Sequence, residues 1–347
     1  MTNILPLRLI WMNLRTLGIG ALGAALAYAA SVPAALLIGP ALTVTAAAIA
    51  GLRMRLSQPL MQVCFVVLGM GVGSGFTAEA GSALLRWPLA FAALAVALLI
   101  IMSLGRLVLT RLFAFDTLSA ALASAPGHLS FALAAAADTG GDLPRIAVVQ
   151  SVRLLALTLS VPFVALAMGI TMAPGVMPPG AAMPLPQLLG LAAAGLALGL
   201  GARRLRLPAP LLLGPMVASA LGHVSGLTTG TLPGWLLMPA FLAMGTLIGT
   251  RFSGMSLSQL RQAGLAGLAI TLISVGVSAL AAMPVALVLA MPAPHVLTGF
   301  APGGLETMVA LGAAMGANPG FIAACHILRL LILSLLIPLS LRRSGAA

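Results

Sequence analysis

Two arginines lie inside otherwise apolar segments of this chain, and their type and position suggest an anion site. Arg153 and Arg329 stand 176 residues apart, and each follows a small-residue segment and a turn. An arginine at the centre of a bilayer costs about 2.5–3.5 kcal/mol even on a lenient scale, so it needs a partner or water. Its planar guanidinium can bind both oxygens of a carboxylate. Two roles therefore stay open: each arginine caps carbonyls or pairs with an acid within the protein, or it binds an anionic substrate.

A proline-glycine tip precedes each arginine. The tips read Ala-Pro-Gly-His at 125–128 and Ala-Pro-Gly-Gly at 301–304. Arg153 lies 11 residues past Asp142, or about 16 Å along a helix, which is the depth expected for the tip. The candidate substrate-binding residues are Arg153, Arg329, Pro126, Gly127, His128, Pro302, Gly303 and Gly304.

Two titratable residues of the second half are candidates for ion coupling. Glu306 is the one acid deep in a tip segment, and its counterpart in the first half is Ser130. It either pairs with a buried arginine or binds a coupling ion, H+ or Na+. His326 lies one helical turn before Arg329. A structural role inside the protein stays open for this histidine.

The composition sets the class of protein. Of the 347 residues, 61% are hydrophobic and 6% are charged, and the mean hydropathy is +1.16. A soluble domain needs about a quarter charged residues to cover its surface. Continuous apolar runs rich in Ala, Leu and Gly also differ from the alternating pattern of a membrane barrel. We therefore expect an all-α polytopic membrane protein whose partner is the lipid bilayer.

The second half of the chain repeats the first. The run Pro33–Pro40 (PAALLIGP) returns as Pro208–Pro215 (PAPLLLGP). We expect repeat one at 1–170, a linker at 171–185 and repeat two at 186–347. Helix breaks are expected at Gly39, Pro40, Gly214 and Pro215, with simple kinking and close packing as the alternative.

The distribution of arginine in the loops predicts the topology. Residues 1–15 form a basic lead, and arginine-rich loops then alternate in opposite senses in the two halves, so the halves should be inverted. Inversion requires an odd number of crossings, which gives five membrane-spanning helices per repeat. The sixth segments, 117–142 and 293–318, are then re-entrant helical hairpins with limbs of roughly 15 Å. Both termini should be cytoplasmic, in a bacterial inner membrane.

The duplicated Gly-Pro pairs, the runs at 73–76 and 249–252, and the two Ala-Pro-Gly-x-Leu tips with their following arginines resemble the bacterial AbrB membrane family. That family is distinct from the small DNA-binding proteins of the same name, and the resemblance covers nearly the whole chain. Labels attached to it include transcriptional regulator and, loosely, ammonia monooxygenase. The family pattern places an acid behind both tips, which Glu306 fits and Ser130 does not.

These observations favour a secondary transporter of a small anionic solute, with its site at the midplane between two hairpins. The alternative is a membrane-embedded regulator or sensor that affects gene expression indirectly, without flux. The sequence has no ligand set for a metal cluster and no Walker motif, so we expect neither an enzyme nor a metal or organic cofactor. The short loops offer no basic module for direct nucleic-acid binding. A homodimer is left open.

Overall fold

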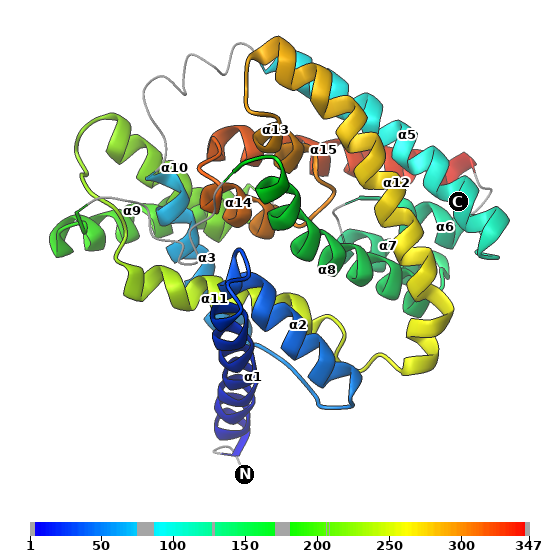
Figure 1. Ribbon diagram of the computed structural model, residues 1–347, viewed down its shortest axis with the longest axis horizontal. Coiled ribbons are helices and arrows are strands. Elements are labelled where there is room, and N and C mark those ends of the chain that lie inside the picture. Colours follow the sequence, from blue (N-terminus) through cyan, green and yellow to red (C-terminus); the bar gives the residue numbers. More distant parts are fainter. Residues whose placement is uncertain are drawn as a thin grey trace. The chain divides into compact units, whose positions relative to one another are not determined.

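The computed structural model describes residues 4–74, 87–126, 129–170, 181–205, 207 and 209–343. Within these ranges the protein is all-helical, apart from one isolated bridge between Ala182 and Thr231 (Figure 1). Six helices in the described ranges are long and apolar enough to cross a membrane, and four others of 15–17 residues are apolar but shorter. The expected all-helical membrane class is therefore confirmed, while the ten-span count stays a prediction. The first helix begins at Ile4, within the basic lead at 1–15 and earlier than the start near residue 16 that the sequence predicted.

The chain forms two compact units, and each unit takes helices from both halves of the sequence. The first unit comprises Met1–Ser82, Pro162–Gly254 and Val309–Gly320. Its main helices are α1 (Ile4–Ala29), α2 (Ala35–Ile49), α3 (Gln58–Gly73), α9 (Leu185–Arg204), α10 (Pro210–Val224) and α11 (Gly234–Thr250). In this unit α2 packs against α1 and α11, and α10 packs against α9 and α3.

Close glycine contacts join the helices of the first unit, and they occur in matched pairs. A Cβ on Gly245 of α11 would lie 2.4 Å from the carbonyl oxygen of Leu37, and one on Gly69 of α3 would lie 2.3 Å from that of Leu212. Gly69 and Gly245 are repeat counterparts, as are Leu37 and Leu212. Each half therefore packs its third helix on the second helix of the other half, through the same pair of positions.

The two Gly-Pro pairs lie inside continuous helices. Pro40 is within α2 and Pro215 is within α10, so the chain stays helical through both pairs. A Cβ on Gly39 would lie 2.2 Å from the Gly23 carbonyl oxygen, and one on Gly214 would lie 2.2 Å from the Gly199 nitrogen. These glycines permit close helix packing, because any side chain larger than a hydrogen atom would clash with the neighbouring backbone.

The second unit comprises Ala83–Val161, Met255–Met308 and Phe321–Ala347. Its helices are α5 (Pro88–Leu112), α6 (Thr117–Ser124), α7 (Leu129–Thr139), α8 (Leu143–Ala167), α12 (Leu257–Leu289), α13 (Ala293–Phe300), α14 (Leu305–Ala314) and α15 (Pro319–Arg343). α14 begins in this unit and continues into the first at Val309, and α8 does the same at Pro162.

Two pairs of short helices, α6–α7 and α13–α14, occupy the segments expected to form hairpins, and α6 packs against α7. Their limbs have 8 and 11 residues in the first hairpin and 8 and 10 in the second. At 1.5 Å per residue each limb is about 12–17 Å long, so none could cross a hydrocarbon core of about 30 Å alone.

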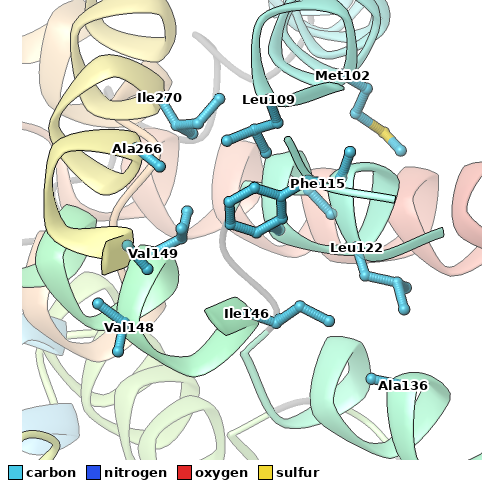
Figure 2. Packing of buried hydrophobic residues seen from close by; sticks show 14 of the residues in the cluster. Met102, Leu109, Phe115, Leu122, Ala136, Ile146, Val148, Val149, Ala266 and Ile270 are labelled. Carbon is cyan, nitrogen blue, oxygen red and sulfur yellow. The ribbon is translucent and has the colours of Figure 1, made fainter. Parts of the chain in front are cut away.

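A buried hydrophobic cluster holds the first hairpin in the second unit. Figure 2 shows Phe115 and Leu122 at the hairpin between Leu109 of α5, Ile146 of α8 and Ile270 of α12. Burial of this apolar surface fixes the hairpin against three longer helices. The first hairpin is thus packed against helices of both halves of the chain.

Four helices of the second half, α10, α13, α14 and α15, begin and end 175 or 176 residues after their counterparts α2, α6, α7 and α8. α2 and α10 have 15 residues each, α6 and α13 have 8 each, and α8 and α15 have 25 each. Unusual backbone conformations recur as well: Ala34 and Ala209 have φ of 50° and 44°, and Ala114 and Ala290 both have 51°. The duplication read from the sequence is therefore also present in the backbone.

Candidate functional site

The base of the first hairpin is tied by a set of local hydrogen bonds. Asp116 caps α6, since its Oδ1 accepts from the Ser119 backbone N–H at 2.8 Å. Burial opposes the charge, but hydrogen bonds from Ser119 and neighbouring N–H groups hold the pKa of Asp116 below its ordinary value. The Ser119 hydroxyl oxygen accepts from the Asp142 N–H at 2.8 Å, and Asp142 Oδ1 accepts from the Arg145 N–H at 3.1 Å. The start of α6 and the start of α8 are thus held together.

The first hairpin tip is held by two side chains of α8. Arg153 is fully buried, and its Nη1 donates to the carbonyl oxygen of Ala125 at 3.2 Å. Its Nη2 donates to Oε1 of Gln150, one turn earlier. Gln150 Nε2 in turn donates to the carbonyl oxygens of Leu122 and Ala125, at 3.1 and 3.0 Å. These carbonyls belong to the last turn of α6, where a helix leaves its carbonyl groups without internal partners.

The second tip has the same arrangement on α15. Arg329 is 1% exposed, and its Nη1 donates to the Ala301 carbonyl oxygen at 2.5 Å. Its Nη2 donates to the Gly303 carbonyl oxygen at 2.7 Å and to Nδ1 of His326 at 2.5 Å. His326 Nε2 contacts the Thr298 carbonyl oxygen at 3.2 Å. A carbonyl oxygen only accepts and a guanidinium only donates, so this geometry assigns the neutral histidine with its proton on Nε2.

The two networks match position by position. Ala125, Leu122, Gln150 and Arg153 correspond to Ala301, Thr298, His326 and Arg329. The hydrogen bonds to the tip carbonyls perform the capping role that was one of the two open interpretations. In both arginines Nε is buried and has no hydrogen-bond partner within the described residues.

The other candidate residues of the tips lie in varied surroundings. Pro126, Pro302 and Gly303 are buried and Gly304 is partly buried. A Cβ on Gly304 would lie 3.7 Å from Leu154 Cδ2 and 3.8 Å from Glu306 Oε2. The second tip therefore lies beside α8, next to the arginine of the first repeat. Gly127 and His128 lie outside the described residues.

Glu306 lies in the first turn of α14 and is partly buried. A carboxylate at this end of a helix is stabilised by the free N–H groups and the helix dipole. Sequence reasoning did not single out Gln150, although the repeat aligns it with His326 and both precede their arginine by three residues. That alignment is the signal that could have identified it.

The fold and the site define a polytopic helical membrane protein built from a duplicated set of helices, in which each half holds a hairpin tip through a buried arginine. The family described as "Transition state regulatory protein AbrB" matches residues 11–344. The chain belongs to this family, as the resemblance in its motifs implied.

Two relatives support this assignment. The chain is 29% identical over 313 residues to "Putative regulator AbrB" of Escherichia coli (strain K12), and the match covers 87% of each chain. It is 25% identical over 295 residues to "Uncharacterized protein YhjN" of Bacillus subtilis (strain 168), covering 79% of this chain and 75% of that protein.

Proposed function

We propose that this protein is a secondary transporter of a small anionic solute, with its site where two re-entrant hairpins from inverted repeats meet near the midplane of a bacterial inner membrane. The observation that carries the proposal is the duplicated network in which buried Arg153 and Arg329 are bound to the hairpin tips. Inverted repeats with broken helices at a central site are a common build of secondary transporters. Two fixed positive charges at such tips favour an anion.

The direction of the hairpin limbs adds to this preference. α6 and α13 end at the tips, and their carbonyls are occupied by the arginines and by Gln150 or His326. α7 and α14 begin at the same tips, so their first N–H groups point there. Helix N-termini of this kind bind anions through free N–H groups and the helix dipole. The arginines thus cover the negative helix ends and leave the positive ends for a ligand.

The two tips differ in charge, which suggests a division of roles. Glu306 brings a carboxylate to the first turn of α14, whereas the equivalent position in the first turn of α7 is Ser130. We therefore assign the anion to the first hairpin and ion coupling to the second. The proposed coupling ion is H+ or Na+, and a proton on Nδ1 of His326 would replace the acceptor that Arg329 uses with a donor and break that contact. Gln150 cannot change in this way.

The test begins with a thermal-shift screen of organic acids on the purified protein, followed by uptake of the best acid into proteoliposomes under H+ or Na+ gradients. We expect concentrative uptake that depends on one gradient and on both arginines. Binding without flux under every gradient tested would reject transport.

A second candidate is a membrane-embedded regulator that binds the same solute without moving it and affects gene expression indirectly. The observation that favours it is the name of the Escherichia coli relative, which describes a regulator. Ligand binding without flux, together with altered expression of target genes in a strain carrying Arg153→Lys, would support this candidate. Under both proposals the protein has no catalytic reaction and no direct contact with nucleic acid.

A further inference from the structure

A basic cavity lies in the second unit, outside the hydrogen-bond networks of the two tips. It has a volume of about 640 Å³ and is lined by the C-terminal part of α5, the start of α6 and Leu336 of α15. Arg106 and Arg111 of α5 contribute its charge, and Thr110 lies between them. Neither arginine belongs to the networks at Ala125 or Ala301.

The hydrogen-bonding groups of this cavity favour an anionic ligand. The hydroxyl groups of Ser103 and Thr110 donate to carbonyl oxygens of their own helix, at 2.7 and 2.9 Å. Within the described part of the chain, the guanidinium groups of Arg106 and Arg111 make no hydrogen bond or ion pair with another residue. The neighbouring acid, Asp116, is engaged in capping α6. The donors that face the cavity therefore include two guanidinium groups, which prefer phosphate or carboxylate oxygens, and the Thr117 hydroxyl.

The rest of the lining is apolar. Leu99, Met102, Ala121 and Leu336 form the other wall, and Leu99 and Leu107 are 49% and 48% exposed. α5 is one of the helices long and apolar enough to cross a membrane, so exposed leucines on it face acyl chains. The cavity thus combines a basic end near the end of a spanning helix with an apolar wall reached from the lipid.

We propose that this cavity binds an anionic phospholipid, with the phosphate at Arg106 and Arg111 and an acyl chain along Leu99 and Leu336. Basic pockets between spanning helices are known to hold lipid headgroups in this way. A free phosphate would need only the basic end and would leave the apolar wall unused. The assignment depends on the membrane class of the protein and is independent of transport.

The test compares phosphatidylglycerol, phosphatidylcholine with the same acyl chains, and inorganic phosphate as additives to the delipidated protein. Lipid retention is measured by native mass spectrometry and stability by thermal unfolding. We expect phosphatidylglycerol alone to be retained and to raise the unfolding temperature. Replacing Arg106→Gln and Arg111→Gln together should weaken retention by roughly fivefold per arginine. Arg203→Gln with Arg204→Gln removes the same charge from α9 and should leave retention unchanged.

Three results would overturn the proposal. Equal retention in the Arg106 and Arg111 variant, equal loss in the Arg203 and Arg204 control, or an equal thermal shift with inorganic phosphate would each reject a lipid at this cavity. If the double variant does not fold, a photoactivatable phosphatidylglycerol is bound to the unmodified protein. Its label should then map to peptides of α5, α6 or α15, and a label found only elsewhere rejects the site.

Discussion

At the scale of single residues, hydrogen bonds to backbone carbonyl oxygens hold the two buried arginines in place. A guanidinium has five N–H donors in a fixed plane, so Arg329 can reach the Ala301 and Gly303 carbonyls and His326 together. A lysine ammonium offers a compact charge on a flexible stem and cannot reproduce this fork. The shape of the group thus matters at the tips as well as its charge.

We predict that Arg153→Lys and Arg329→Lys still fold but bind the solute at least about tenfold more weakly, a loss of about 1.4 kcal/mol. The measurement is solute binding by isothermal titration, with size-exclusion profiles as the check on folding. Arg261→Lys on α12 is a control for the chemical change alone. Unchanged affinity in both tip variants would reduce the two arginines to structural caps.

The repeat itself supplies a matched substitution for His326. Gln150 accepts from Arg153 and donates to Leu122, as His326 does with Arg329 and Thr298. His326→Gln should therefore keep the fold while removing the group that can gain a proton. We expect solute uptake by this variant to lose its dependence on a proton gradient, measured against Glu306→Gln in the same vesicles. A fully retained proton dependence in both variants would exclude coupling at the second tip.

At the scale of helices, the short limb α6 depends on its first turn. Eight residues make a marginal helix, so a side chain that satisfies the first N–H groups contributes noticeably. Asp116 does this, and its lowered pKa means that its contribution is complete above its unfolded pKa and is lost as the pH falls through the folded value.

Asp116→Ala should lower the free energy of unfolding by about 1 kcal/mol, because alanine cannot cap. Asp116→Asn keeps a capping oxygen and should therefore retain most of this stabilisation at neutral pH. Thermal unfolding in detergent measures both, with Asp138→Ala on the exposed side of α7 as the control. An equal loss in the asparagine variant would assign the effect to charge instead of capping.

Helix packing in the first unit gives a prediction of opposite sign for two glycines. Gly245→Ala would place a methyl group 2.4 Å from the Leu37 carbonyl oxygen and should cost roughly 1–3 kcal/mol. Gly18→Ala on α1 meets nothing within 4 Å and should be neutral or slightly stabilising, since alanine is the better helix former. Thermal unfolding of the two variants provides the comparison, and similar behaviour would contradict the close contact.

The sequence predicted the helices well where hydropathy and the repeat agreed. It predicted them less well where contacts between helices determine whether a helix continues and which groups its side chains bind. The hairpin limbs could be placed because both Ala-Pro-Gly tips interrupt segments too short to cross twice. The continuity of α2 through Pro40 could not be predicted, because local chemistry favours a kink and the close approach of Gly23 is visible only in three dimensions. The alignment of Gln150 with His326 marks the position, but the carbonyl groups that Gln150 binds are visible only in three dimensions.

At the scale of the whole molecule, the sequence repeats and the compact units are different divisions of the chain. Each unit contains segments of both halves, so the predicted boundary at 171–185 separates repeats in sequence but not folded bodies. Hydropathy and loop charge report how a chain crosses a membrane and carry no information on which helices share a core. The inverted orientation itself remains a prediction.

Two counterpart turns can test that orientation. Leu52 follows α2 and Leu227 follows α10, they are 44% and 77% exposed, and each comes directly after a glycine of positive φ. Leu52→Cys should react with a membrane-impermeant maleimide only from the cytoplasmic side, and Leu227→Cys only from the outer side. The native Cys64 and Cys325 are buried and should give little background. Labelling of both turns from one side would rule out inverted repeats.

The reciprocal contacts of Gly69 with Leu212 and of Gly245 with Leu37 have a consequence for each half of the chain. When position i of one half contacts position j of the other half, and position j of the first contacts position i of the second, the contact is the kind found in two-fold symmetric dimers. A half-length chain would leave these faces of its second and third helices uncovered and could bury them only against another copy. Each half of the present chain therefore covers helix faces of the other half that it could not cover with its own residues.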